Sequence, residues 1–176
     1  MKTESKTPAA TGVQEKNDDI LNIKYQEPAK TSIEIDAILT APISTFNGTE
    51  PEPVGISSTE VTLNYIKSGE YKEKIKWVQA ALPDRSEYAK RKKTLPSVTF
   101  SCRVTYRGLE TNLKNPKSGP HNLISTTHLI ALDFDHLADK INTIRQALQS
   151  DTTILACFTS PGGEGLKVIL YSSGIL

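Results

Sequence analysis

The first apolar pattern along the chain lies in residues 33–39, where apolar and acidic side chains alternate. An alternation of period two is typical of a half-buried strand, and we predict one there. Residues 1–30, before it, contain few large apolar side chains and predict a disordered tail. Prolines and glycines between residues 42 and 55, after it, predict a loop.

Helical spacing then dominates the chain. Ser57 and Glu60 have the spacing of a capping box, which favours the start of a helix, and Gly69 is a natural stop for it. Apolar residues at intervals of four, three and four follow, as on one face of a second helix. We therefore expect three consecutive helices, over residues 57–69, 70–82 and 84–93.

Strand patterns dominate the second half of the chain. β-Branched and aromatic residues over 98–106 predict a strand, and residues 108–126 predict a polar loop. The apolar run 128–132 predicts a buried, central strand. After it we expect a helix, a strand, a glycine-rich turn and a last strand, over residues 137–148, 153–159, 160–165 and 166–171. This order predicts an α+β fold, with an α/β sandwich as the alternative, and helices packed on an antiparallel or mixed sheet.

The composition sets the size and the setting of this fold. The chain has 176 residues, of which 37% are hydrophobic, and this suits one domain with a modest core. Cys102 and Cys157 are too few and too far apart for a disulfide framework or a zinc site. No apolar run approaches the ~18 residues of a membrane span, and no apolar signal-peptide region follows Met1. We expect a cytoplasmic protein that has no membrane partner.

Charge is distributed unevenly along the chain. The net charge is +1, yet residues 72–117 contain 12 basic and 4 acidic side chains. The densest group consists of four adjacent cations, Lys90, Arg91, Lys92 and Lys93. Such a group predicts a polyanionic partner such as nucleic acid, and the alternative is a solvated helix face.

Two carboxylates follow the apolar run of the expected central strand. Asp133 and Asp135 are two residues apart, so on a strand they would point to the same face. Two neighbouring carboxylates repel each other, and a divalent cation such as Mg²⁺ removes that penalty. The alternative is that the strand simply leaves the core here and Asp135 caps the next helix.

A glycine-rich turn offers a second candidate site. Gly162, Gly163 and Gly165 would let the backbone approach a ligand closely. Ser160 adds a hydroxyl, and Lys167 adds a point charge for phosphate. The spacing is not that of a Walker A loop, and a plain hairpin turn is the alternative. The acidic pair and this turn together suggest a metal and nucleotide site.

Three segments read LPSVTFS, LIALDFD and SPGGEGLK, at residues 95–101, 129–135 and 160–167. They resemble the VirE N-terminal domain family, which occurs in Bacteroides-type mobile-element proteins, often at the front of primase–helicase proteins. With a helical lead-in, the resemblance covers residues 57–171 and implies one domain over residues 31–176. That family is itself similar to the archaeo-eukaryotic primase–polymerase superfamily, which implies a partial primase-like (RRM-like) sheet.

The resemblance implies a nucleotidyltransferase domain of a mobile-element replication protein. Asp133 and Asp135 would be the catalytic metal ligands for Mg²⁺ or Mn²⁺, and a 3′-hydroxyl would attack the α-phosphate of a nucleoside triphosphate. A helicase domain, or a protein encoded nearby, is an expected partner. The nucleotide contacts would come from Ser160, Gly162, Gly163, Gly165 and Lys167. The contacts to nucleic acid, with DNA as the expected strand, would come from Lys90, Arg91, Lys92, Lys93, Arg103 and Arg107.

The sequence also departs from the family pattern. Lys167 stands where many members of the superfamily carry His, and Gly162 and Cys102 stand where relatives usually carry Ser and Gly. The third metal-binding acid expected beyond the last strand is absent, so we expect a domain that is incomplete at its C-terminus and a weak metal site. The alternative function is a non-catalytic module that binds nucleic acid or a nucleotide.

Overall fold

The computed structural model describes residues 32–108 and 122–172. The tail predicted for residues 1–30, and most of the loop predicted for residues 108–126, lie outside the described residues. In chain order the elements are α1 (Ser32–Thr40), β1 (Pro42–Phe46), β2 (Gly55–Ser58), α2 (Thr59–Ser68), α3 (Lys72–Gln79), α4 (Arg85–Lys92), β3 (Ser97–Val98), β4 (Cys102–Val104), β5 (Leu123–Thr126), β6 (Leu129–Phe134), the 3-10 helix η3 (Ala138–Lys140), α5 (Ile141–Leu148), β7 (Ile154–Thr159) and β8 (Leu166–Tyr171).

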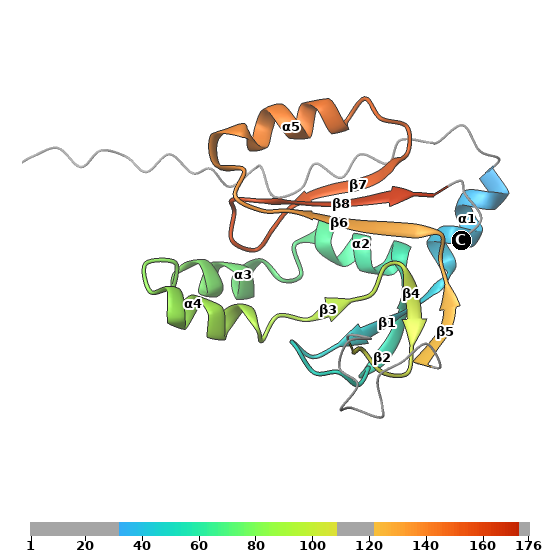
Figure 1. The fold of residues 1–176 in the computed structure, drawn as a ribbon, viewed down its shortest axis with the longest axis horizontal. Helices are drawn as coiled ribbons and strands as arrows, with labels where there is room; N and C mark the ends of the chain where they lie inside the picture. The colour runs from blue at the N-terminus through green and yellow to red at the C-terminus, as the bar shows by residue number, and fades with distance from the viewer. Residues whose placement is uncertain (1–31, 109–121, 173–176) are drawn as a thin grey trace, which may run out of the picture.

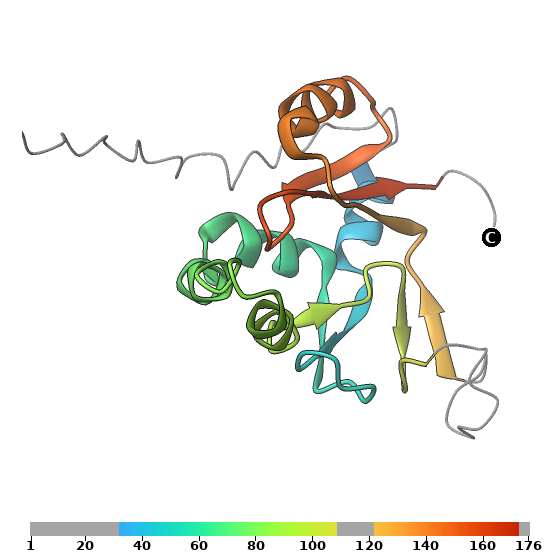
Figure 2. The same cartoon turned by 60° about the vertical axis from the view of Figure 1, so that its left-hand side comes forward.

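The predicted α+β class is confirmed, and every strand pair in the described residues is antiparallel (Figure 1). The strands form three small sheets, with the orders β2-β1-β3, β4-β5 and β6-β8-β7. The third sheet separates two layers, because α5 covers one of its faces and α2 lies against the other (Figure 2).

Each face of the sheet β6-β8-β7 has its own apolar cluster. The cluster under α5 contains Leu166 and Val168 of β8, packed against Ile141 and Ile144. The cluster on the opposite face joins this sheet to α2 and β1 through Leu63, Ile43, Phe100, Leu129, Leu155, Ala156 and Ile169. Strands β7 and β8 are therefore covered on both faces, as their apolar sequences require.

The strand predicted over residues 128–132 exists as β6, but it is neither central nor fully buried. In the described part of the sheet β8 lies in the middle and β6 at one edge. Ala131, Leu132 and Asp133 are exposed. The tight turn after β7 places β8 beside β7, so β6 pairs with the other edge of β8. An apolar run alone does not reveal this order.

The strand predicted over residues 33–39 is wrong, because these residues lie in α1. Ile35, Ile38 and Leu39 share one helix face at spacings of three and four, and all three are partly buried. Ile38 and Leu39 pack against the cluster that contains Leu63. Four alternating residues are compatible with the period of a strand and with that of a helix. The helix forms because it packs this apolar face against the core.

Three further corrections concern the small sheets. The loop predicted for residues 42–55 begins with strand β1, and the single strand predicted for residues 98–106 is divided into β3 and β4, which belong to different sheets. The end of the predicted polar loop forms β5, which pairs with β4. Isolated strands of two to five residues contain too few positions for a clear periodic pattern.

The three predicted helices are confirmed as α2, α3 and α4, with α3 shorter than expected. The cap of α2 is Ser58 rather than Ser57, and its Oγ accepts a hydrogen bond from the Val61 N–H. Gly69 ends α2 with φ 75°, a conformation that glycine adopts without strain. In the described part of the chain, no helix has the length and apolarity that a membrane crossing needs.

Candidate functional site

An ion pair connects the two motifs that the sequence singled out. Asp133 of β6 lies directly opposite Lys167 of β8 in the strand register. The Lys167 Nζ donates a hydrogen bond to the Asp133 Oδ2, and both side chains are partly exposed. The residues predicted to hold metal and phosphate therefore contact each other at one end of the sheet.

The glycine-rich turn is closed by its own backbone. The Ser160 N–H donates to the Gly165 carbonyl at 2.8 Å, and the Gly163 N–H donates to the Ser160 carbonyl at 2.9 Å. Gly163 has φ 82°, a conformation that favours glycine. Ser160 is buried in this turn.

Two glycines of the turn lie so close to neighbouring elements that a side chain at either position would clash. A Cβ on Gly165 would lie 2.5 Å from the Phe134 carbonyl oxygen, at the end of β6. A Cβ on Gly162 would lie 2.6 Å from the Tyr88 hydroxyl of α4. The glycines therefore bring the turn against β6 and α4, which agrees with the hairpin alternative and also positions Ser160 beside the acidic strand.

The segment after Asp135 is strained. His136 and Ala138 have φ 58° and 46°, in the left-handed region that non-glycine residues rarely adopt. The Leu137 N–H donates to the Glu164 carbonyl at 2.8 Å, so the turn holds this segment in place. Backbone strain of this kind, on the order of 1–3 kcal/mol per residue, is concentrated at functional sites in proteins.

Helices α3 and α4 supply contacts to the turn that the sequence did not predict. The Gln79 Nε2 donates to the Pro161 carbonyl at 3.1 Å, across 82 residues of sequence. Burial raises the pKa of Tyr88, and the nearby Glu164 and Asp135 carboxylates add to the rise, against an opposing effect of Arg85. The sequence did not predict these contacts, because they join residues that are far apart in the chain and no local pattern distinguishes Gln79 or Tyr88.

The donor chemistry of Asp133 and Asp135 fits a divalent cation. Both residues are exposed at the end of β6, and Mg²⁺ prefers carboxylate oxygens supplemented by water and phosphate oxygens. The described residues contain no group of three or more His, Cys, Asp or Glu side chains placed to hold a metal. Asp133 and Asp135 would thus be the carboxylate ligands of a cation at this place.

The predicted nucleic-acid contacts do not form one surface. Lys90 to Lys93 lie on or just after α4, whereas Arg103 is half-buried on β4, at the other end of the molecule (Figures 1 and 2). Arg107 donates to the Ser97 Oγ at 2.9 Å and to the Gly48 and Glu50 carbonyls, and stacks over Phe46. Arg107 therefore fastens the β1–β2 connection to β3.

Replacing Arg107 with alanine is expected to lower the free energy of unfolding by about 2 kcal/mol, because it removes three hydrogen bonds from a charged donor and the stacking on Phe46. Chemical denaturation measures this change. Arg85→Ala is the matched control, since Arg85 is exposed, and should stay within about 0.5 kcal/mol of the wild type. Equal stability of the Arg107 and Arg85 variants would contradict the structural role.

The two cysteines lie in strands, and Cys157 packs in the apolar cluster under α5. Cys157 is buried and Cys102 is partly buried. Burial raises the pKa of both thiols, so the reactive thiolate form is disfavoured at each.

The family model described as the BT4734-like N-terminal domain, a Bacteroides-type family, matches residues 90–174, just under half of the chain. The matched segment begins within α4 and contains Asp133, Asp135, the glycine-rich turn and Lys167. No curated protein and no solved structure matched the chain. Residues 90–174 are therefore similar to this family, and the relation to the VirE N-terminal domain stays a prediction.

Proposed function

We propose that this domain binds a nucleoside triphosphate together with Mg²⁺ or Mn²⁺ at the end of β6 and β8, as the primase–polymerase-like domain of a mobile-element replication protein. The observation that carries the proposal is the Asp133–Lys167 pair beside the glycine-rich turn. Acidic residues for a cation and a basic residue for phosphate are thereby neighbours. The resemblance to the VirE N-terminal domain family supports the same assignment.

Each side chain has a distinct task in this proposal. Lys167 exchanges the Asp133 carboxylate for a phosphate oxygen, because both are anionic oxygen acceptors. Asp133 and Asp135 would hold the cation, which when bound supplies positive charge to the phosphate oxygens. Tyr88 and Gln79 are positioning residues, since they contact the turn that places Ser160 and Lys167.

The proposed reaction is nucleotidyl transfer. A 3′-hydroxyl oxygen forms a bond to the α-phosphorus, the bond between the α-phosphorus and its bridging oxygen breaks, and pyrophosphate leaves with that oxygen. The hydroxyl proton is lost to solvent. The cations of α4 are the proposed contacts to the template or primer backbone.

Nucleotide binding without chemistry is a second candidate function, and one observation favours it. Asp133 is already neutralised by Lys167, so this carboxylate is paired before any cation binds. A primer-extension assay separates the two functions, because only the enzyme lengthens the strand.

Replacing both acids, as Asp133→Asn/Asp135→Asn, is expected to abolish the part of nucleotide binding that depends on Mg²⁺ or Mn²⁺. Isothermal titration of ATP into the purified chain, with and without each cation, measures this. Lys167→Met should weaken binding roughly ten- to hundredfold, since a charge-assisted hydrogen bond contributes about 1.5–3 kcal/mol.

The matched control is Asp36→Asn/Asp139→Asn, which removes two exposed carboxylates from α1 and η3. It should bind nucleotide as the wild type does. Equal metal-dependent binding by the Asp133/Asp135 variant, or no nucleotide binding by the wild type, would refute the proposal.

A further inference from the structure

The hairpin of α3 and α4 exposes a tryptophan that no part of the proposed nucleotide site uses. Trp77 is the only tryptophan of the chain, and 45% of it is exposed. The adjacent Val78 is fully buried, so the register of α3 turns Trp77 outwards. Burial of so large an apolar side chain is normally favourable, and its exposure on a folded surface is informative.

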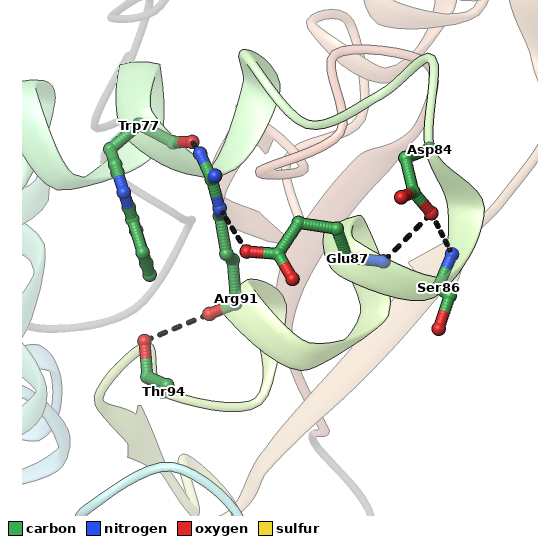
Figure 3. A network of polar contacts seen from close by, with 6 residues as sticks. All are labelled: Trp77, Asp84, Ser86, Glu87, Arg91 and Thr94. Carbon is green, nitrogen blue, oxygen red and sulfur yellow. Dashed lines mark hydrogen bonds and ion pairs between the residues drawn. The ribbon is translucent and has the colours of Figure 1, made fainter.

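Contacts from α4 hold Trp77 in one orientation (Figure 3). The Arg91 guanidinium carbon lies 4.6 Å from the centre of the Trp77 ring, and the Arg91 Nη1 donates to the Trp77 carbonyl at 2.8 Å. Glu87 in turn accepts from the Arg91 Nε at 2.8 Å. The Arg91 guanidinium thereby holds the Trp77 ring from one face. Because the ring is already ordered, less entropy is lost when a ligand stacks against it.

The surface around Trp77 carries an excess of positive charge. Residues 72–93 contain 8 basic and 3 acidic side chains, in a chain whose net charge is +1. Each of the three acids is already engaged: Glu73 pairs with Lys76, Glu87 pairs with Arg91, and Asp84 accepts from the Ser86 and Glu87 N–H groups at the start of α4.

Several cations of the hairpin are left to bind a ligand. Lys72, Lys90 and Lys93 are exposed, and none of them pairs with an acid of the described residues. A long-chain polyanion can contact such lysines while one of its parts reaches Trp77. The charge of the hairpin therefore complements a nucleic-acid backbone.

We infer that the α3–α4 hairpin binds single-stranded nucleic acid, with an unpaired base stacked on Trp77 and with phosphates on Lys72, Lys90 and Lys93. A base must be unpaired to stack on a side chain, so this surface discriminates against a duplex. An anionic membrane is the less suitable partner, because Trp77 is the only large apolar side chain that α3 and α4 expose in the described structure. The inference deepens the proposed function and rests on it for the class of partner: it adds Trp77 and Lys72 to the cations of α4, and it uses no residue of the nucleotide site at the end of β6 and β8.

Tryptophan fluorescence tests the inference directly, since the emission comes from Trp77 alone. Titration with oligo-dT or oligo-U is expected to quench the emission, and duplex DNA of the same length is expected to leave it unchanged. Comparison of the two single strands distinguishes DNA from RNA. Binding without quenching, or equal quenching by the duplex, would overturn the assignment of Trp77.

Variants measure the contribution of Trp77 to affinity. In anisotropy titrations with a labelled oligo-dT, Trp77→Leu is expected to weaken binding roughly five- to hundredfold, whereas Trp77→Phe retains most of it. Tyr65→Leu is the matched control, because Tyr65 is a 49% exposed aromatic residue on α2. Equal weakening by the Trp77 and Tyr65 leucine variants, or none by Trp77→Leu, contradicts the inference. Thermal melts confirm that the variants are folded.

Salt dependence tests the lysines. Lys90→Gln/Lys93→Gln should make the slope of log affinity against log salt shallower by roughly 0.7 for each phosphate that the variant no longer neutralises. An unchanged slope would mean that these lysines do not contact the phosphates. Tighter binding to anionic vesicles than to oligo-dT would assign the surface to a membrane instead.

The two proposals can fail separately. A chain that binds oligo-dT with quenching of Trp77 but binds no ATP supports the hairpin surface and refutes the nucleotide site. A chain that binds ATP through Asp133 and Asp135 but shows no quenching refutes the hairpin surface alone.

Discussion

Replacing Gly165 with alanine is expected to destabilise the protein by about 1–3 kcal/mol and to abolish metal-dependent nucleotide binding. The added Cβ would lie 2.5 Å from the Phe134 carbonyl oxygen and 3.1 Å from the Ser160 Oγ. Both atoms belong to tightly held segments, so the turn must move away from β6. Such a movement separates Ser160 and Lys167 from the two aspartates. Denaturation and ATP titration of the same preparation measure both effects.

Gly162→Ala provides the comparison for Gly165→Ala. Its Cβ would meet the Tyr88 hydroxyl at 2.6 Å, and this atom is the end of a side chain that can shift. We therefore expect a smaller loss of stability and only weakened nucleotide binding. If Gly162→Ala proved the more damaging of the two, the close approach of the turn to β6 would not be what positions the site.

Leu63→Ala is expected to destabilise the protein by about 2–5 kcal/mol, the usual range for removing a buried leucine. Leu63 is 0% exposed and lies between α2 and the sheet β6-β8-β7. Val61→Ala is the matched control, because Val61 lies in the same helix and is 43% exposed. It should change the free energy of unfolding by no more than about 0.5 kcal/mol. Urea denaturation of both variants measures the difference.

The Leu63 variant also tests the extent of the folding unit. The matched family segment, residues 90–174, excludes α2 and β1, yet Leu63 and Ile43 share a core cluster with Leu129 and Ile169. A small effect of Leu63→Ala would mean that α2 contributes little to the stability of the sheet. A large effect makes α2 a part of the same domain.

Local patterns predicted those parts of the fold whose signals lie within one element. The strands β7 and β8 and the turn between them formed as predicted. The helix predicted over residues 137–148 formed as α5, which begins only at Ile141, after the 3-10 helix η3. Gly69 stops α2 and Asp84 caps α4, because these effects depend on neighbours within a few residues. Strong local preference and tertiary packing agree in these elements.

The remaining features depend on contacts between distant residues. The edge position of β6 results from the pairing of β8 with β7, and the helical state of α1 results from packing of Ile38 and Leu39. The cross-strand pair of Asp133 and Lys167 follows from the register of β6 and β8, which the sequence does not state. The sequence nevertheless suggested one candidate site that contains both residues, from their chemistry and their places at strand ends, and the structure brings the two side chains into contact.

The contacts of the exposed Trp77 could not be predicted from the sequence either. The spacing assigned the apolar stripe of this helix to Tyr71, Ile75, Val78 and Leu82, and Trp77 lies off that stripe. Its contact with Arg91 requires α4 to pack against α3, across a turn that no periodic pattern describes. An aromatic residue off the buried stripe of a basic helix is nevertheless a signal that sequence inspection can use.

The most direct test of the central claim is to locate the bound cation by NMR. Mn²⁺, added with ATP to the isotopically labelled chain, broadens the signals of nuclei close to it. We predict selective broadening of the amides of Asp133, Asp135, Ser160 and Lys167, with no broadening in the Asp133→Asn/Asp135→Asn variant. Broadening centred elsewhere, or uniform across both proteins, would contradict a nucleotide and metal site at the end of β6 and β8.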